Sequence, residues 1–282
     1  MPAPPADVRS LEGRCVAVEA CGDDGCILRL VTEEPLPPIR AARFFMLRRE
    51  DRLSPAIPRP FSLYRQVGEE LQFLIKVTGE GTRALAACTE GTRLRVIGPL
   101  GNGWPALDGE GPPWVMLGGG IGSAPFYKGI EQALAGMDGK RPAKPEQITY
   151  VYGAARKGLL YDLEAFQSLG VRVAVCTDDG SLGFKGNVLQ LLTRLQERKE
   201  LPREIRLLAC GPERMLEAVE EHARAKGIPC WLSLETVMGC GVGICNGCPV
   251  PTRPEGPRGS WPNAKCCVEG PVFSTDEVVL HA

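Results

Sequence analysis

Apolar strands alternate with helices between residues 109 and 232, and this rhythm limits the possible folds more than any other feature of the chain. The strand-like runs are WVMLGG, QITYVYGA, VRVAVCT and IRLLACG. Helical spacing is found in the runs APFYKGIEQALAG, NVLQLLTRLQERK and ERMLEAVEEHARAKG. Strands that alternate with helices form parallel βαβ units. We therefore predict a doubly wound parallel α/β domain over residues 109–232.

The segments on either side have different patterns. Residues 1–108 contain short β-prone runs, among them CILRLVT, RFFMLRR, SLYRQV, LQFLIKV and TRLRVIG, separated by Pro, Gly or charged turns. Antiparallel strands at this spacing predict a small β-barrel, with at most a turn or two of helix at TRALAAC. Residues 233–282 have little periodicity and are rich in Gly, Pro and Cys. The chain is therefore expected to form three domains, 1–108, 109–232 and 233–282.

Composition excludes several classes of protein. The net charge of −1 argues against a nucleic acid as the main partner. No apolar stretch approaches the roughly 20 residues that span a bilayer, and the start MPAPPADVRS lacks the pattern of a secretory signal. We expect a cytoplasmic protein with no membrane partner. In a reducing compartment its 12 cysteines point to metal binding or catalysis rather than to disulfides.

Six of the cysteines are scattered along the chain and are interpreted as small buried hydrophobic residues. They are Cys15, Cys21, Cys26, Cys88, Cys176 and Cys230.

Two glycine-containing turns follow strands of the predicted α/β sheet. GGGIGSAP, residues 118–125, opens a helix, and its glycines would let a pyrophosphate approach the free backbone N–H groups there. ACGPERML places a second turn at the same carboxyl edge. The candidate nucleotide-binding residues are Gly118, Gly119, Gly120, Gly122, Cys210, Gly211 and Pro212. The alternatives are a glycine-rich turn without a ligand and a cysteine that only packs.

The barrel segment carries two further motifs, RPFS at residues 59–62 and GEGT at residues 79–82. An arginine can bind a phosphate with two hydrogen bonds, and Gly81 and Thr82 can present amides and a hydroxyl group at a helix start. Phe61 could lie against a flavin ring. A strand with a surface Arg59 would have the same sequence.

The most specific motif is GCGVGICNGC, residues 239–248. Cys240, Cys245 and Cys248 have the C-x4-C-x2-C spacing of plant-type [2Fe–2S] proteins, which use a distant fourth cysteine. Glycines between the thiolates let the backbone wrap the cluster and direct N–H groups at its sulfur atoms. A zinc site is the alternative, although structural zinc more often uses two separated C-x2-C pairs. Cys266 and Cys267 are both candidates for the fourth position.

In this order, RPFS, GEGT, GPLGNGW, GGGIGSAP, TDDGSLGFKGNV, ACGPERML, SLETVMGCGVGICNGC and CVEGPVF resemble one family. It is the family of electron-transfer subunits of NAD-linked dihydroorotate dehydrogenase, a branch of the ferredoxin–NADP reductase superfamily. The resemblance covers nearly the whole chain. Two features depart from it: AARFFML replaces a Pro-Gly-Gln-Phe turn, and the loop between Cys248 and Cys267, with its five prolines, is longer.

The resemblance implies specific cofactor residues. FAD would be held by Arg59, Pro60, Phe61 and Ser62, by the backbone of Leu74, Ile75 and Lys76, and by Gly81 and Thr82. The cluster ligands would be Cys240, Cys245, Cys248 and Cys267, because the family's fourth ligand stands just before x-x-Gly-Pro-Val-Phe. Cys266 stays the alternative to Cys267.

The resemblance also implies a redox relay that uses FAD, one [2Fe–2S] cluster and a nicotinamide nucleotide, with no catalytic acid–base pair. A separate FMN-containing subunit would oxidise dihydroorotate, in an assembly of two copies of each subunit, and its electrons would reach NAD⁺ through this chain. Two other functions stay open: a related reductase subunit of a hydrogenase or another flavoenzyme, and a zinc-stabilised binding module without catalysis. NAD and NADP are not distinguished, since Arg156 is either a structural residue or a reader of the 2′-phosphate.

Overall fold

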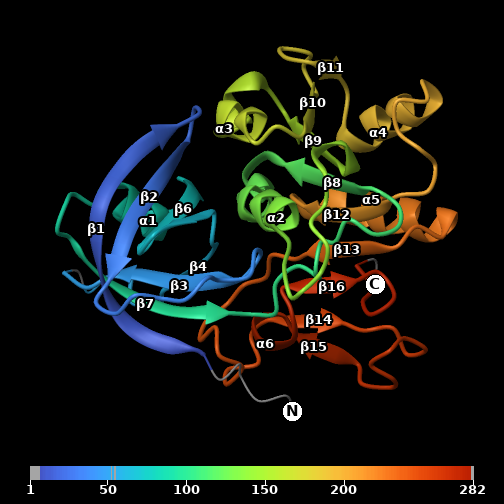
Figure 1. The fold of residues 1–282 in the computed structure, drawn as a ribbon. Coiled ribbons are helices and arrows are strands. Elements are labelled where there is room, and N and C mark those ends of the chain that lie inside the picture. Colours follow the sequence, from blue (N-terminus) through green and yellow to red (C-terminus); the bar gives the residue numbers. More distant parts are fainter. Residues whose placement is uncertain (1–6, 52, 54, 281–282) are drawn as a thin grey trace.

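A computed structural model describes residues 7–51, 53 and 55–280. Residues 1–6, part of the start that carries no secretory pattern, lie outside the described residues. Figure 1 shows a curved β domain beside an α/β domain. The C-terminal segment packs below the α/β domain, next to the lower strands of the β domain. The predicted combination of an antiparallel barrel, a doubly wound α/β domain and a small C-terminal segment is confirmed.

The barrel is one antiparallel sheet of seven strands in the order β4-β3-β7-β1-β2-β6-β5. Its strands are β1 (Arg9–Cys21), β2 (Gly25–Thr32), β3 (Phe44–Arg49), β4 (Arg59–Ser62), β5 (Arg65–Val67), β6 (Glu70–Lys76) and β7 (Arg93–Leu100). Leu28, Phe45 and Phe73 are fully buried inside it. Edge strand β4 lies beside β6, so the sheet curls into an open barrel.

The barrel differs from the sequence prediction in detail. The run SLYRQV is not one strand, because Leu63 and Tyr64 turn inward, fully buried, between β4 and β5. The turn or two of helix predicted at TRALAAC is present as α1 (Glu80–Ala86), which begins two residues earlier. The 13-residue strand β1 was missed, since its polar residues interrupt the apolar alternation.

The central sheet has the order β11-β10-β9-β8-β12-β13-β16 and is parallel up to β13. Its parallel strands are β8 (Trp114–Gly119), β9 (Ile148–Ala154), β10 (Arg172–Thr177), β11 (Phe184–Lys185), β12 (Arg206–Cys210) and β13 (Cys230–Ser233). Helices α2 (Ala124–Ala135) and α3 (Leu163–Ser168) pack on one face, and α4 (Val188–Glu197) and α5 (Glu213–Lys226) on the other. The inner strands are apolar throughout because both faces are covered.

Short 3₁₀ turns join these elements: η1 (Gly120–Ser123), η2 (Pro145–Gln147) and η3 (Lys157–Leu159). From β8 the parallel strands are added outward in the sheet, first as β9 and β10 on one side of β8 and then as β12 and β13 on its other side. The order therefore reverses between β8 and β12. Ligands of doubly wound sheets bind at the carboxyl ends of the strands at such a point.

The C-terminal segment is joined to the central sheet. It contains the hairpin β14 (Pro249–Pro251) and β15 (Asn263–Lys265), helix α6 (Cys266–Glu269) and strand β16 (Val272–Ser274). Strand β16 pairs antiparallel with β13, so that Phe273 lies opposite Leu232. A strand of three residues is too short to show a period in the sequence, so β16 is identified only by its pairing with β13.

One asparagine ties the barrel to this segment. The Asn102 side-chain amide donates hydrogen bonds to the carbonyl oxygens of Glu269 (3.0 Å) and Val272 (2.7 Å). Its side-chain oxygen accepts a hydrogen bond from the Val272 N–H at 3.1 Å. The Asn102 N–H donates to the Gly270 carbonyl oxygen at 2.8 Å. These four bonds fix residues 269–272 against the end of β7.

A second contact joins the barrel to the α/β domain. The Asp162 carboxylate accepts hydrogen bonds from the Tyr64 hydroxyl group and from the Arg65 guanidinium group, both at 2.7 Å. The Arg65 guanidinium also lies 3.9 Å from the centroid of the Tyr127 ring on α2. A charge-assisted pair of this kind is stronger than a neutral hydrogen bond. It holds the barrel against helix α2.

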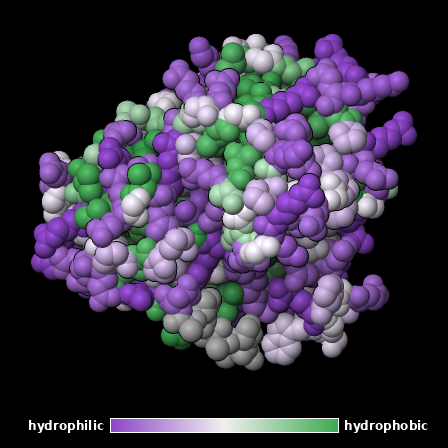
Figure 2. Space-filling model, viewed as in Figure 1, coloured by the Kyte–Doolittle hydropathy of each residue, from purple (hydrophilic) through white to green (hydrophobic). Residues whose placement is uncertain are grey.

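Hydrophilic side chains cover most of the face shown in Figure 2, and the apolar residues among them form small patches. In the described part of the chain, no helix has the length and apolar character needed to cross a membrane.

Asp162→Asn tests the contact between the domains. Its backbone has φ 49°, a left-handed conformation that asparagine also tolerates, so the substitution removes the charge without straining the chain. We expect the free energy of unfolding to fall by about 1–2 kcal/mol and the Tm to fall by roughly 3–5 °C in calorimetry. Glu164→Gln, the same change on an exposed position of α3, is the control. Equal shifts in the two variants would contradict the assigned role of Asp162.

Candidate functional site

The two predicted glycine turns touch each other at the carboxyl edge of the central sheet. A Cβ atom at Gly211 would lie 3.0 Å from Gly119 Cα, and one at Gly122 would lie 2.6 Å from Gly211 Cα. Side chains at these positions would force β8 and β12 apart. The glycines are therefore required by the packing of the two turns, in addition to any approach of a phosphate.

A cavity of about 310 Å³ lies between the barrel and these turns, and we call it the barrel-side cavity. Its walls come from β3, β4 and β6 of the barrel, from the residues after β8, from Cys210 at the end of β12, and from the chain that follows β13. The lining residues that the sequence predicted are Pro60, Phe61, Ser62, Leu74, Lys76, Gly122 and Cys210. Its polar residues and apolar walls, drawn from both domains, suit a large planar ligand.

The remaining predicted residues of the barrel lie outside this lining. Ile75 is fully buried, so its side chain belongs to the barrel core and only its backbone faces β2. Arg59 lies over the start of α1, where a Cβ atom at Gly81 would be 3.1 Å from its Cγ. The Thr82 hydroxyl group already caps α1, since it accepts a hydrogen bond from the Gly79 N–H at 3.0 Å. Arg59 and the α1 backbone are therefore the groups available to a phosphate.

A second cavity, of about 390 Å³, opens over the glycine turns, and we call it the turn cavity. Four of the predicted nucleotide-binding residues line it: Gly119, Gly120, Gly211 and Pro212. Gly118 lies below, where a Cβ atom would be 2.8 Å from Tyr150 Cε2, so its role is packing.

Tyr161, Asp178 and Glu235 are among the residues of the turn cavity that sequence reasoning missed. They follow η3, β10 and β13. A polar residue just after a parallel strand was the available signal for Asp178 and Glu235.

Lys76, Ile121 and Glu235 line both cavities, so the two spaces meet at these residues. Glu235 remains solvent-accessible, yet the surrounding walls withdraw enough water from its carboxyl group to raise its pKa.

Two contacts connect the four predicted ligand cysteines. The Cys245 N–H lies 3.4 Å from the Cys240 sulfur, and the sulfur atoms of Cys248 and Cys267 lie 3.2 Å apart. Among the described residues, no three His, Cys, Asp or Glu side chains gather around a single metal position.

The surroundings of Cys240 and Cys248 favour their thiolates. Desolvation opposes ionisation of Cys240, but hydrogen bonds from backbone N–H groups, including that of Cys245, lower its pKa to about 7. The hydrogen bond with the Cys267 side chain lowers the pKa of Cys248 to about 6. Thiolates are the form that binds metal.

The side chains of the adjacent residues Cys266 and Cys267 point in different directions. Cys266 is fully buried, and its sulfur lies 3.7 Å from the Leu234 carbonyl oxygen, while Cys267 faces Cys248. This geometry favours Cys267 over Cys266 as the fourth ligand.

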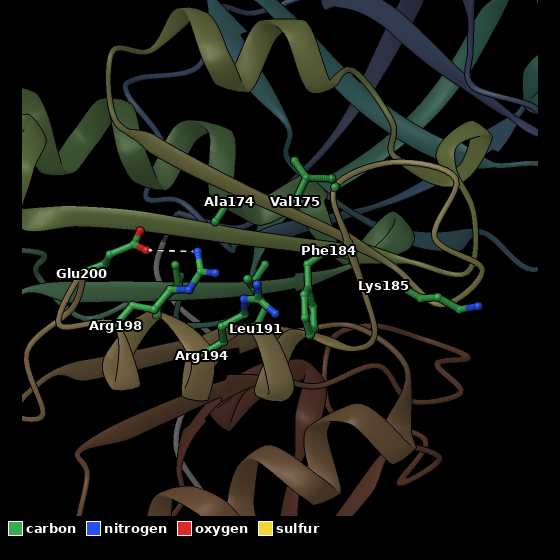
Figure 3. Close-up of a pocket in the computed structure, with 10 residues that line it drawn as sticks. Ala174, Val175, Phe184, Lys185, Leu191, Arg194, Arg198 and Glu200 are labelled. Carbon is green, nitrogen blue, oxygen red and sulfur yellow. Dashed lines mark ion pairs between the residues drawn. The ribbon is translucent and has the colours of Figure 1, made fainter.

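A larger cavity, of about 550 Å³, lies at the outer edge of the central sheet, between β10, β11 and α4. Figure 3 shows Phe184, Leu191 and Arg194 around it. The Arg194 guanidinium lies 5.2 Å from the centroid of the Phe184 ring, and Arg198 pairs with Glu200 at 3.8 Å. None of the predicted cofactor residues lines this cavity, and we assign it no ligand.

Two family models match separate parts of the chain. Residues 235–279 match the iron–sulfur cluster binding domain of dihydroorotate dehydrogenase B, and residues 116–221 match an oxidoreductase NAD-binding domain. Neither model includes the barrel.

Two curated relatives are named dihydroorotate dehydrogenase B (NAD(+)), electron transfer subunit. The chain is 32% identical to the one from Bacillus pumilus over 243 residues, which cover 85% of this chain and 86% of the relative. It is 34% identical to the one from Caldanaerobacter subterraneus subsp. tengcongensis over 224 residues, 79% of this chain and 81% of the relative.

Solved structures extend the likeness. An NADH-dependent reduced ferredoxin–NADP oxidoreductase, described in connection with flavin-based electron bifurcation, superposes with a TM-score of 0.78 at 27% identity, over 95% of this chain and 90% of that one. A ferredoxin NADP⁺ reductase from Neisseria gonorrhoeae with bound FAD and NADP has a TM-score of 0.61 at 17% identity, over 79% of this chain and 92% of that one. The second likeness shows the fold alone.

Replacement of each adjacent cysteine by serine tests the ligand assignment. Cys267→Ser should lose or distort the cluster, because its sulfur belongs to a pair, whereas Cys266→Ser should retain it. Iron, acid-labile sulfide and visible absorption of anaerobically purified protein are the measurements, with about two irons and two sulfides expected in the wild type. The reverse pattern would move the fourth ligand to Cys266, and zinc without sulfide would rule out a redox cluster.

Proposed function

The chain belongs to the family of electron-transfer subunits of dihydroorotate dehydrogenase B, and we propose that it carries electrons from a partner flavoprotein subunit to NAD⁺. The path uses a [2Fe–2S] cluster and FAD, both held by this chain. The partner is an FMN-containing subunit that oxidises dihydroorotate to orotate in pyrimidine biosynthesis, in an assembly of two copies of each subunit.

One observation carries this proposal: the chain after β13 runs directly from the barrel-side cavity to the cysteine loop. Leu234, Thr236 and Met238 line the cavity, and Cys240 follows Met238 by two residues. Two residues of extended chain span at most about 7 Å. A ligand in the cavity and a cluster on Cys240 are therefore held close together by a short covalent segment.

The barrel-side cavity fits the flavin ring of FAD. Phe61 and Leu74 supply apolar contact area from the barrel, and the Ser62 hydroxyl group is available to hydrogen-bond the ring. Arg59, over the start of α1, is positioned for the pyrophosphate. When bound there, FAD exchanges two electrons with a nicotinamide and single electrons with an iron–sulfur cluster.

The turn cavity fits the nicotinamide nucleotide. Gly119, Gly120 and Gly211 have no side chains, so the phosphates of the nucleotide could approach the backbone at these residues. Because Lys76, Ile121 and Glu235 border both cavities, a nicotinamide ring among them would face the flavin. The side chains here position the two rings and exclude water, and no acid–base pair is needed for hydride transfer.

Cys240, Cys245, Cys248 and Cys267 are the proposed cluster ligands. Three large apolar side chains of the same C-terminal segment are exposed: Val237 is 87% exposed, Ile244 81% and Trp261 64%. Exposed apolar side chains of this size are typical of protein contacts. They support docking of the partner subunit at the cluster.

None of the 12 cysteines forms a disulfide bond, which suits the cytoplasm.

A second candidate is a reductase subunit that serves a different flavoenzyme. The close superposition on the NADH-dependent oxidoreductase favours it, since that protein shares the fold over 95% of this chain. Identification of the protein that co-purifies with the chain distinguishes the two.

The division of labour between subunits gives a direct test. The recognised sites handle FAD, a nicotinamide and a cluster, so the isolated chain should oxidise NADH with ferricyanide as acceptor and should not convert dihydroorotate to orotate. Addition of the partner subunit should restore dihydroorotate oxidation coupled to NAD⁺. Orotate formation by the isolated chain would contradict the proposal. The proposal would also be contradicted if the isolated chain oxidised neither NADH nor NADPH.

Arg59→Ala tests the FAD assignment. Loss of a charge-assisted pair with the pyrophosphate should weaken FAD binding by about 10- to 100-fold, measured by flavin release on dilution. Excess FAD should restore NADH oxidation. Arg95→Ala, which removes an exposed barrel arginine paired with Glu50 at 2.6 Å, is the matched control. Full flavin retention in the Arg59 variant would mean that the pyrophosphate is held elsewhere.

A further inference from the structure

Lys265, at the end of strand β15, reaches with its side chain to the cysteine loop, residues 239–248. Its ammonium group donates a hydrogen bond to the Gly243 carbonyl oxygen at 2.7 Å. Gly243 lies between Cys240 and Cys245, two of the proposed cluster ligands. The positive charge is therefore held on the backbone that would surround the cluster.

The main chain of Lys265 lies beside the other two proposed ligands. In the β14–β15 hairpin Lys265 pairs with Pro249, the residue after Cys248. The Cys266 N–H then donates a hydrogen bond to the Cys248 carbonyl oxygen at 2.9 Å. Cys267 follows Lys265 by two residues. Lys265 therefore contacts both halves of the ligand set, one through its main chain and the other through its side chain.

Packing fixes the loop against this side chain. Gly243 has φ 84°, a left-handed conformation that favours glycine. A Cβ atom at Gly243 would lie 2.7 Å from Val268 Cγ2 on α6 and 3.9 Å from Lys265 Cδ. The loop thus rests on α6 and on the stem of Lys265, and dense packing of this kind leaves little room for the ammonium group to move.

The charge of Lys265 acts on a ligand sulfur atom. The hydrogen bond with Cys267 is the main cause of the lowered pKa of Cys248, and the positive charge of Lys265 acts in the same direction. Lys265 is half-buried, and a partly buried charge is screened by salt less than an exposed one. Its effect therefore extends to negative charge on the ligands.

The chain between β14 and β15 carries two more cations, and both are used in ion pairs. Arg253 pairs with the buried carboxylate of Glu220 on α5. Arg258 lies 2.9 Å from a Glu269 carboxylate oxygen and 3.0 Å from one of Glu277. These carboxylates balance the two arginine charges, and the pairs hold the segment together.

The sign of the effect follows from electrostatics. One-electron reduction adds one negative charge to an iron–sulfur cluster and its thiolates, and the reduction potential depends on the charges and hydrogen bonds around them. A fixed positive charge nearby stabilises the reduced form more than the oxidised form. It therefore raises the reduction potential.

We propose that Lys265 sets the reduction potential of the cluster, by holding a positive charge at the Gly243 carbonyl oxygen, where it stabilises the reduced form. The inference rests on the proposed function, because it requires the cluster. A higher potential makes the cluster a better acceptor of single electrons from the partner subunit and a weaker donor to FAD.

The test measures the reduction potential of the cluster in the full-length, FAD-loaded protein, by an anaerobic redox titration followed by electron paramagnetic resonance. Lys265→Gln keeps a hydrogen-bond donor and removes the charge, and Lys265→Met removes both. Each should shift the equilibrium toward the oxidised cluster by about tenfold, which corresponds to a potential about 59 mV lower for a one-electron couple.

Two further variants are the controls. Lys265→Arg keeps the positive charge, so its potential should stay close to that of the wild type. Lys144→Gln removes an exposed lysine just before η2, at the amino edge of the central sheet, and should leave the potential unchanged. Iron content and the resonance spectrum of each variant show whether the cluster is intact.

An unchanged potential in both neutral variants would overturn the proposal, and so would a shift in Lys265→Arg as large as theirs. If one neutral variant fails to hold the cluster, the other provides the measurement. Failure of both to hold it would assign Lys265 to cluster assembly and would also overturn the proposal. Wild-type protein without iron would refute the proposed function as well, whereas an intact cluster that is insensitive to Lys265 would refute only this inference.

Discussion

One hydrophobic core runs through all three segments of the chain, and the arrangement of both cavities and the cysteine loop depends on it. Phe44 and Met46 of the barrel share this core with Leu234 and Met238 of the segment that follows β13. A Cβ atom at Gly241 would lie 2.6 Å from Met46 Cγ, so the cysteine loop rests directly on the barrel. Dense packing of this kind resists small displacements. The distance between the cavity and the loop is therefore set by contact, as direct electron transfer requires.

The cysteines show how burial separates chemical roles within one residue type. The six scattered cysteines are all buried, as the sequence predicted. Desolvation raises the pKa of Cys26 to about 11 and that of Cys88 to about 12, so these thiols stay protonated and only fill space. In the cysteine loop, hydrogen bonds lower the pKa of Cys240 to about 7. Thiolate character follows the supply of hydrogen-bond donors, which the glycine-rich backbone provides.

The glycines of the two βα turns satisfy two requirements at once. They let β8 and β12 approach each other, and three of them, Gly119, Gly120 and Gly211, line the turn cavity. The motif that the sequence predicts to bind a phosphate is therefore also a packing motif. This explains why Gly118 belongs to the pattern although it lies beneath Tyr150 rather than in the cavity wall.

The sequence by itself determined the features that local patterns encode: the alternating α/β rhythm, the β-prone first segment, the glycine turns and the C-x4-C-x2-C spacing. The tertiary structure alone decided which of Cys266 and Cys267 faces Cys248, that Glu235 borders both cavities, and that β16 joins the central sheet. It also decided that Arg156 pairs with Asp23, 133 residues away. Helix and strand periods arise from neighbouring residues, whereas these contacts join distant parts of the chain and exist only once the three segments share a core.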